Sequence, residues 1–363
     1  SEMCIRDRFI VRLKFKIMRL TTIFIAFIFS LNTAIAQDYF LENNGPYDNN
    51  IQSPEEYLGY EIGFEHTRHD LIVAYLKYLS NVSEKAQLIK YGESHEGRDL
   101  IMLTVSSTEN LNNLEKIKNE HLKHTVPGTK TKIDNSLPII VNLGYGVHGN
   151  EPSSAEAAIL AAYTLVASEN NKVQRLIQNS VIFIDPTINP DGRDRHSQWA
   201  NQYKSINLVA DSNDAEHNEA WPRGRTNHYW FDLNRDWLLG INPESRGKLE
   251  WYHSWYPNVV TDFHEMGTNS NYFFEPMKRN ASVKPMIPDE NYSVLSPIFA
   301  EYYVKALDSI GSFYYTKESF DETYPGYGSS YPDVQGAVAI LFEQASSRAV
   351  SYTHLRAHET LRY

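Results

Sequence analysis

Four short apolar runs divide the chain, and each is bounded by polar or turn-forming residues. The runs lie near 138–143, 181–185, 257–263 and 337–342. Apolar segments of this length with such borders are typical of buried strands. Between them, helices are predicted near 154–167, 171–178 and 292–310. The alternation predicts an α/β fold with a mixed, mostly parallel central sheet and helices on both faces.

The residues before the first of these strands are predicted to form shorter elements. We expect a helical segment within Ser53–Leu79, a hairpin around Ser94–Arg98 and a polar helix over Asn110–Lys123. No internal repeat and no Pro-rich or Ser-rich linker separates these elements from the rest of the chain. A single domain is therefore expected.

A long stretch from Arg193 to Tyr229 has few strand or helix signals. In a compact protein such a stretch is usually functional, and we expect it to form one wall of the substrate cleft. Trp199, Trp221 and Trp230 lie in or beside it. We expect these tryptophans to pack against the protein rather than to bind sugars.

Charge and cysteine content narrow the possible partners and chemistry. The formal net charge of −11 argues against nucleic acid as a partner. Cys4 is the only cysteine, and it lies close to the N-terminus. The rest of the chain therefore offers no thiol nucleophile, no disulfide and no cysteine metal ligand.

Residues 18–36 have the features of a signal peptide. A basic residue follows Met18, an apolar stretch runs from Ile23 to Leu31, and Ala34-Ile35-Ala36 forms a small-residue cleavage site. The apolar stretch is too short to span a bilayer. We expect cleavage after Ala36 and a secreted or periplasmic protein with no membrane span in the mature chain. An uncleaved N-terminal anchor is the alternative.

Two terminal segments look foreign to the protein, because Ser1–Arg8 and Val350–Tyr363 resemble translated sequencing-adapter DNA. The expected parts are a non-native leader over residues 1–17, the signal peptide, a folded domain over 37–349 with its core over about 55–349, and a non-native tail over 350–363. On this interpretation the natural chain continues past Ala349, and the present chain is truncated at its C-terminal end.

Candidate metal ligands follow two of the predicted strands. His148 and Glu151 come after the first strand, and His264 comes after the third. Ser153 and Glu156 have the spacing of a capping box, which predicts a helix start that leaves the first two ligands in a strand-to-helix loop. Ligands of α/β sheets bind at this edge. Two histidines and a carboxylate can hold a catalytic zinc in three of its four tetrahedral positions.

Further motifs follow in a fixed order. Asn189-Pro190-Asp191-Gly192 reads as a turn, Asp232-Leu233-Asn234-Arg235 lies before the third candidate ligand, and Glu343 ends the last apolar run. Upstream, Gly92–Asp99 has the pattern of a hairpin. Together with His-x-x-Glu and the late histidine, the set resembles the zinc carboxypeptidases of the carboxypeptidase A type (peptidase family M14) over about residues 55–349. Several motifs in order are far more specific than any one of them.

The resemblance implies roles for the first group of residues. It makes His148, Glu151 and His264 the ligands of one zinc ion. It makes Glu343 the general base and acid that takes a proton from a zinc-activated water and passes it on. Glu265, next to His264, competes for that role, but its side chain should point away from the site because neighbouring residues of a strand face opposite ways. We choose Glu343.

The Asp-x-Asn-Arg motif matches three further roles in the family. Asp232 corresponds to the carboxylate that orients the first histidine ligand. Asn234 and Arg235 correspond to the pair that grips the C-terminal carboxylate of a peptide, since a guanidinium can bind a carboxylate through two parallel hydrogen bonds. A structural arginine paired with Asp236 or Asp232 is the alternative for Arg235.

Two assignments within the resemblance stay open. Arg225 is preferred to Arg223 as the oxyanion-stabilising arginine. Tyr327 is preferred to Tyr324 as the tyrosine that closes over substrate, because glycines flank it. The family's arginine immediately after the first zinc histidine is missing, since Gly149 and Asn150 stand there.

These observations together predict an exported zinc metallocarboxypeptidase. It would hydrolyse the last peptide bond of peptide or protein C-termini with one Zn²⁺, and we expect it to be a monomer. One alternative is a zinc-dependent amidase or deacylase on the same scaffold, acting on acylated amino acids or cell-wall peptides. Another is a catalytically inactive peptide-binding module.

Overall fold

The computed structural model of the chain describes residues 36–128, 132, 134–206, 209, 211, 213–268, 270–279 and 284–346. Two compact units, Ser1–Gly45 and Pro46–Tyr363, divide the chain. In the first unit the structure describes helix α2 (Ala36–Asn44). The expected leader, the tail and all of the signal peptide except Ala36 lie outside the described residues. The following paragraphs concern the second unit.

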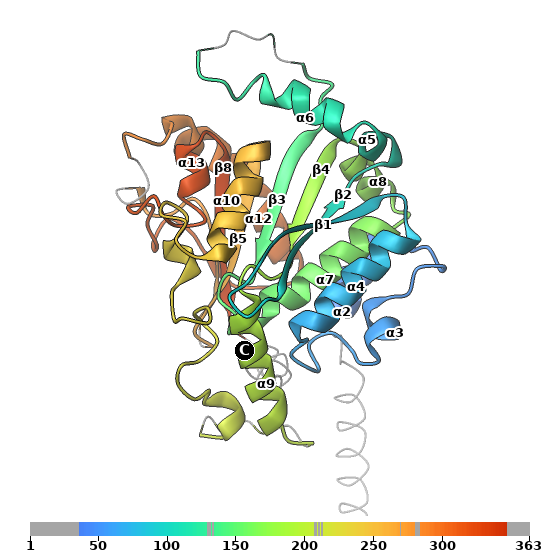
Figure 1. Cartoon of the computed structure of the whole chain (residues 1–363), viewed down its shortest axis with the longest axis vertical. Helices are drawn as coiled ribbons and strands as arrows, with labels where there is room; N and C mark the ends of the chain where they lie inside the picture. The colour runs from blue at the N-terminus through green and yellow to red at the C-terminus, as the bar shows by residue number, and fades with distance from the viewer. Residues whose placement is uncertain are drawn as a thin grey trace, which may run out of the picture. The chain divides into compact units, whose positions relative to one another are not determined.

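Eight strands form one mixed sheet (Figure 1). They are β1 (Ala86–Glu93), β2 (Asp99–Val105), β3 (Ile139–Tyr145), β4 (Ser180–Asp185), β5 (Val259–Met266), β6 (Tyr272–Phe274), β7 (Tyr314–Tyr315) and β8 (Val338–Ala345). Their order is β1-β2-β4-β3-β5-β8-β6-β7. The central strands β4, β3, β5 and β8 run parallel, while β1–β2, β2–β4 and β6–β8 pair antiparallel. The predicted mixed α/β sheet and the hairpin at Ser94–Arg98 are confirmed.

Helices connect and cover the strands. The α-helices of the second unit are α3 (Pro54–Leu58), α4 (His69–Val82), α5 (Thr108–Asn112), α6 (Leu114–Leu122), α7 (Pro152–Ala167), α8 (Asn171–Gln178), α9 (Pro190–Tyr203), α10 (Pro243–Trp255), α12 (Ser296–Ser309) and α13 (Tyr331–Val334). Shorter helical turns are η1 (Ala215–His217), η2 (Leu233–Arg235) and η3 (Asn291–Leu295).

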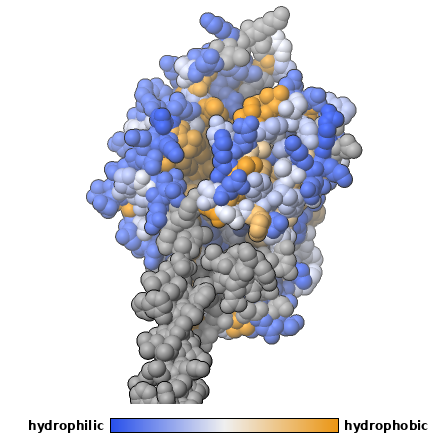
Figure 2. Space-filling model, turned by 180° about the vertical axis from the view of Figure 1, so that it is seen from behind, coloured by the Kyte–Doolittle hydropathy of each residue, from blue (hydrophilic) through white to orange (hydrophobic). Residues whose placement is uncertain are grey.

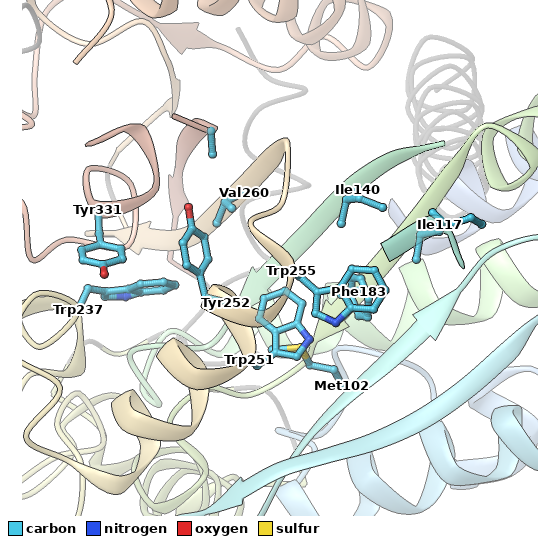
Figure 3. Close-up of a cluster of buried hydrophobic side chains, with 12 residues drawn as sticks. Met102, Ile117, Ile140, Phe183, Trp237, Trp251, Tyr252, Trp255, Val260 and Tyr331 are labelled. Carbon is cyan, nitrogen blue, oxygen red and sulfur yellow. The ribbon is translucent and has the colours of Figure 1, made fainter. Parts of the chain in front are cut away.

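Both faces of the sheet carry helices, as the side chains of β5 show. Val260 belongs to an apolar cluster with Trp251 and Trp255 of α10. Its neighbour Val259 packs in a different cluster with Phe299 of α12. Successive residues of a strand point to opposite faces, so α10 and α12 cover opposite sides of the sheet. Figure 3 shows the first cluster, in which aromatic residues of α10 gather beside residues of the strands.

The α10 side of the sheet also buries a charged pair. Lys248 is 2% exposed, and its Nζ donates hydrogen bonds to Asp185 Oδ2 at 2.8 Å and to Asn142 Oδ1 at 2.9 Å. Tyr91 donates its hydroxyl hydrogen to the same Asp185 oxygen at 3.0 Å. Burial lowers the pKa of Lys248 and raises the pKa of Asp185. The charge of each residue opposes this effect of burial, because it stabilises the charged form of the other residue. Removing one partner of such a pair leaves an uncompensated buried charge.

One segment predicted to be irregular is helical. Asn189 precedes α9 as its N-cap, and its Oδ1 accepts a hydrogen bond from Gly192 N at 2.9 Å. Pro190 then occupies the first turn of the helix, where its missing N–H costs nothing. The predicted turn over 189–192 is therefore a helix start. The irregular stretch begins after Tyr203 rather than at Arg193.

The tryptophans of this stretch are more exposed than expected. Trp199 packs on Tyr203 and donates Nε1–H to Ala215 O at 2.9 Å. Trp221 and Trp230 are 75% and 59% exposed, with ring centres 4.9 Å apart. The prediction that all three pack into the protein is wrong for Trp221 and Trp230.

Hydrophilic residues cover most of the coloured surface in Figure 2, with apolar residues between them. Over the part of the chain that the structure describes, no helix combines the length and apolar character needed to cross a membrane.

Candidate metal centre and active site

Two neighbouring strands bring the candidate metal ligands to one edge of the sheet. β3 ends at Tyr145, three residues before His148, and β5 carries His264 near its own end at Met266. β3 and β5 pair in parallel, so their carboxyl ends lie at the same edge, where α/β proteins place their sites. His148, Glu151 and His264 meet there.

Glu151 stands directly before helix α7, but the capping differs from the prediction. The helix begins at Pro152 with Glu151 as the N-cap residue, and Ser153 does not cap it with its side chain. The Glu156 carboxylate instead accepts hydrogen bonds from Thr67 N and Thr67 Oγ1, both at 2.7 Å. The capping box of Ser153 and Glu156 is therefore wrong, although His148 and Glu151 do lie outside the helix.

The three side chains have the geometry of a tetrahedral metal site. His148 Nδ1 lies 2.8 Å from Glu151 Oε1, and His264 Nδ1 lies 3.1 Å from Glu151 Oε2. The two Nδ1 atoms are 3.1 Å apart. Zinc–nitrogen bonds of about 2.0–2.1 Å in a tetrahedron place two nitrogens about 3.3 Å apart. Ligand atoms of all three residues lie within 4.8 Å of one another, and all three residues are buried. They fit a zinc ion.

Carboxylates hold the outer nitrogen of each ring. His148 Nε2 lies 3.0 Å from Asp232 Oδ1, and His264 Nε2 lies 2.9 Å from Asp262 Oδ2. Because a carboxylate can only accept a hydrogen bond, Asp232 favours a hydrogen on Nε2 of His148 and leaves its Nδ1 for a metal, while Asp262 places a negative charge beside Nε2 of His264.

The electrostatics of the centre favour a cation. Burial by itself raises the pKa of Glu151, but His148 and His264 hold that pKa well below its usual range. Burial lowers the pKa of both histidines, yet the neighbouring carboxylates raise it above the ordinary value. These carboxylates favour positive charge at the centre. A divalent cation can supply that charge in place of the protons on the histidine rings.

Glu343 lies beside the metal centre on the next strand. It pairs with His264 in the register of β5 and β8. Burial, with the negative charges of Glu151 and Asp262, raises the pKa of Glu343 to about 7, against the opposing effect of the histidines. A carboxyl group with a pKa near neutrality can both accept and return a proton at neutral pH.

Glu265 has a similar pKa but a different position. Burial raises the pKa of Glu265 to about 7 as well. Its carboxylate accepts a hydrogen bond from Ser153 N at the start of α7, and its own N–H donates to Glu151 Oε2 at 3.1 Å. Orientation, rather than pKa, therefore separates the two acids. Glu265 supports a ligand, whereas Glu343 is the acid beside His264 on the neighbouring strand.

Of the two arginine candidates, Arg225 reaches the centre. Its Nη2 donates to Asp232 Oδ2 at 3.0 Å and its Nη1 to Glu151 Oε1 at 3.4 Å. The side chain remains 43% exposed, so a ligand can reach it. Arg223 has a positive φ of 62°, and its carbonyl accepts a hydrogen bond from Arg195 Nη1 at 2.9 Å.

Asn234 and Arg235 lie at the rim of the same centre, on η2. Asn234 Nδ2 lies 3.0 Å from His264 Nε2, and its Oδ1 accepts a hydrogen bond from Gly328 N at 2.7 Å. Arg235 Nη1 donates to Asn234 O at 2.9 Å, and its guanidinium carbon lies 4.5 Å from the ring centre of Tyr327. Tyr324 donates its hydroxyl hydrogen to Arg235 O at 2.9 Å. Both tyrosine candidates thus contact this arginine.

Among the described residues, no ion pair joins Arg235 to Asp232 or Asp236. Asp236 instead accepts hydrogen bonds from Ile241 N at 3.0 Å and Asn242 N at 2.9 Å. The guanidinium of Arg235 is therefore not committed to a structural carboxylate in the described part of the chain.

A family model described as zinc carboxypeptidase matches residues 72–354. The chain belongs to the zinc carboxypeptidase family. The metal that gives the family its name suits the centre formed by His148, Glu151 and His264.

Similar proteins include other members of this family. The chain is 28% identical to carboxypeptidase Z of Mus musculus over 179 residues, which are 48% of this chain and 22% of the relative. It is 23% identical to the carboxypeptidase N catalytic chain of Rattus norvegicus over 261 residues, which are 66% of this chain and 52% of the relative. The chain therefore spans about a fifth of the length of the first relative and about half of the length of the second. The crystal structure of carboxypeptidase A from Helicoverpa armigera has the same fold, with a TM-score of 0.52 and 17% identity over 85% of this chain and 70% of that one.

The structure explains why this zinc carboxypeptidase has glycine directly after the first histidine. A Cβ atom on Gly149 would lie 2.1 Å from Arg193 N and from Gly192 C at the start of α9. Any side chain would collide with this backbone.

Asp262 is the functional residue that the sequence analysis missed. Asp262 and His264 are two residues apart on β5 and therefore point to the same face. This spacing was the available signal. The backbone of Gly328 packs against the same carboxylate, because a Cβ atom there would lie 2.7 Å from Asp262 Oδ2.

Proposed function

We propose that the protein is an exported zinc metallocarboxypeptidase that removes the last residue from peptide or protein C-termini. The observation that carries the proposal is the convergence of a tetrahedral ligand set, Glu343 and the Asn234–Arg235 pair at one sheet edge. The export part rests on the signal-peptide pattern of residues 18–36.

Glu343 is the residue that moves the proton. His148, Glu151 and His264 would hold a zinc ion, which would supply the chemistry of acidifying water and polarising the scissile carbonyl. Glu343 accepts a proton from the attacking water and passes it to the leaving amine, which suits its pKa of about 7. Arg225 offers its exposed guanidinium to the negative charge that develops on the carbonyl oxygen.

Arg235 sets the position of the cut. Its guanidinium can bind the free carboxylate at the end of a peptide through two charge-assisted hydrogen bonds. The ring of Tyr327 stacks on it from the loop between β7 and α13. Asn234 lies between His264 and this loop, so it links the metal centre to the carboxylate anchor.

A comparison of free-acid peptides with their C-terminal amides tests the proposal. Mass spectrometry of the products should show single residues released from free-acid peptides. Arg235→Ala should lower kcat/KM on these peptides by at least about 30-fold, because a charged anchor contributes on the order of 2–5 kcal/mol. Arg246→Ala, on the exposed side of α10, is the matched control and should leave the rate unchanged.

Two other outcomes would replace the proposal. An Arg235→Ala variant that keeps its activity on acylated amino acids or cell-wall peptides would identify a deacylase. A protein that binds peptides but holds no zinc after dialysis would be a peptide-binding module.

A further inference from the structure

Glu219 connects two loops of the candidate active site. The ligand loop, residues 146–151, joins β3 to α7, and the Arg225 loop, residues 218–232, joins η1 to η2. Glu219 Oε2 accepts a hydrogen bond from Asn150 Nδ2 at 3.1 Å, and its Oε1 accepts one from Gly224 N. Asn150 directly precedes the ligand Glu151, and Gly224 directly precedes Arg225. One carboxylate thus shapes the Arg225 loop and ties it to the ligand loop.

The surroundings of Glu219 keep it charged. Its side chain is 10% exposed, and its Oε1 lies 3.4 Å from His196 Nδ1 of α9. Burial by itself raises the pKa of Glu219, but His196 and the hydrogen bonds from Asn150 and Gly224 hold that pKa below its ordinary value. Glu219 is therefore a carboxylate at neutral pH. Hydrogen bonds to an ionised acceptor are about twice as strong as those between neutral groups.

The backbone of the Arg225 loop packs closely against α9 at the same point. A Cβ atom on Gly224 would lie 2.7 Å from His196 Cβ and 3.1 Å from Glu219 Oε1, so this position has no room for a side chain. Asn189, the N-cap of α9, donates from Nδ2 to Arg225 O at 3.1 Å. These contacts place the main chain of Arg225 against the helix, and Glu219 sets its place relative to the ligand loop.

The position of this main chain matters because Arg225 works through its guanidinium. Its Nη2 donates to Asp232 Oδ2 at 3.0 Å and its Nη1 lies 3.4 Å from Glu151 Oε1, while 43% of the side chain is exposed. A donor that stabilises a developing negative charge must be in place before the reaction. A displacement of about 1 Å in such a group can lower the rate by about 10²-fold.

We propose that Glu219 is a positioning residue: by bridging Asn150 and Gly224 it holds Arg225 where its guanidinium can stabilise the negative charge of the transition state. The inference rests on the proposed carboxypeptidase function, because it assigns a further residue to the same reaction. Glu219 acts through Arg225 and not on the substrate, and this distinction can be measured.

A double-mutant cycle on the zinc-loaded enzyme, with a free-acid peptide as substrate, tests the inference. Glu219→Ala should lower kcat by at least about tenfold and change KM by less than about threefold, because the lost interaction belongs to the transition state. Arg225→Ala should lower kcat by about 10²–10³-fold. Adding Glu219→Ala to Arg225→Ala should lower kcat by less than about twofold more, because the group that Glu219 positions is already absent.

A conservative variant separates the hydrogen bonds from other effects of the substitution. In Glu219→Gln the side-chain oxygen can still accept from Gly224 N. Asn150 Oδ1 has no hydrogen-bond partner among the described residues, so its amide can turn over and accept from the glutamine NH₂. Glu219→Gln should therefore keep at least about a third of the parent kcat, since both bridging hydrogen bonds can form.

Two more variants complete the experiment. Asp211→Ala removes an exposed carboxylate from the same irregular stretch and is the matched control, with kcat expected to equal that of the parent. Should Glu219→Ala fail to fold, Glu219→Asp takes its place in the cycle, because the shorter side chain cannot reach both partners. Zinc content is measured and matched for every variant.

Equal losses of kcat from Glu219→Ala with and without Arg225 would overturn the inference and leave the carboxypeptidase function intact. A Glu219→Ala variant with the parent kcat, or one no slower than Asp211→Ala, would also overturn it. A Glu219→Gln variant as slow as Glu219→Ala would refute the bridging hydrogen bonds. Failure of the zinc-loaded parent to release a residue from any peptide would overturn the proposed function and the inference with it.

Discussion

Glu343→Gln is expected to remove activity and, at the same time, to stabilise the metal-free protein. The side chain has no hydrogen-bond partner among the described residues, and glutamine has nearly the same shape. The substitution therefore removes a negative charge and little else. Loss of a general base lowers kcat by about 10²–10⁴-fold, or roughly 3–5 kcal/mol of transition-state stabilisation.

The gain in stability follows from the pKa of Glu343. Burial raises this pKa from the ordinary value of 4.5 to about 7. An acid whose pKa is higher in the folded state contributes stability below its unfolded pKa, and this stability is lost as the pH rises through the folded pKa. The change of about 2.5 pH units corresponds to about 3 kcal/mol of unfolding free energy above pH 7. The glutamine variant cannot ionise and avoids this loss.

Thermal unfolding of the metal-free proteins at two pH values measures the effect. The melting temperature of Glu343→Gln should exceed that of the parent by roughly 6 °C at pH 8 and by almost nothing at pH 4. Steady-state kinetics at matched zinc content gives the loss of kcat. Glu265→Gln is the control, because this acid is also buried but points toward α7, and it should lower kcat less than about tenfold.

Either of two results would refute this reasoning. A Glu343→Gln variant with full zinc content and more than a tenth of the parent kcat would exclude Glu343 as the base. If the difference in melting temperature between the variant and the parent is the same at pH 4 and pH 8, burial does not disfavour the ionised form of Glu343.

Two further substitutions probe the support of the site. Asp262→Asn should weaken zinc binding by about 10–100-fold, because the negative charge beside Nε2 of His264 is lost; competition with a chelator measures it, and unchanged affinity would contradict the assigned role. Lys248→Met should lower the unfolding free energy by about 3–5 kcal/mol by leaving Asp185 unpaired, and adding Asp185→Asn should recover most of it. Denaturant unfolding checks both variants, and a loss below about 1 kcal/mol would contradict the account.

Local pattern was enough to predict the fold class and to place the candidate metal ligands after strands. The apolar runs near 138–143, 181–185, 257–263 and 337–342 became β3, β4, β5 and β8 of the central sheet. Each run is short, apolar and bounded by polar or turn-forming residues, which favours a buried strand, so the strands could be predicted from local sequence. Because the ligands directly follow such strands, their meeting at one sheet edge follows from parallel pairing.

The partners of these residues could not be predicted in the same way. Ser153 and Glu156 have the spacing of a capping box, yet Glu156 binds Thr67, which lies 89 positions away in the sequence. Asn189–Gly192 has turn residues, yet it starts a helix. Local spacing indicates which interactions are possible. Competition from groups that are far away in the sequence decides which of these interactions form.

The sequence by itself determined where strands end and therefore where the histidines and Glu343 stand. Only the tertiary structure decided the rest, because the rest depends on contacts between segments far apart in the chain. The contact of Asp262 with His264, the hydrogen bond of Arg225 to Asp232 and the buried pair of Lys248 and Asp185 all arise when separate segments pack together. Burial then changes what their charges can do, and burial is a property of the folded molecule.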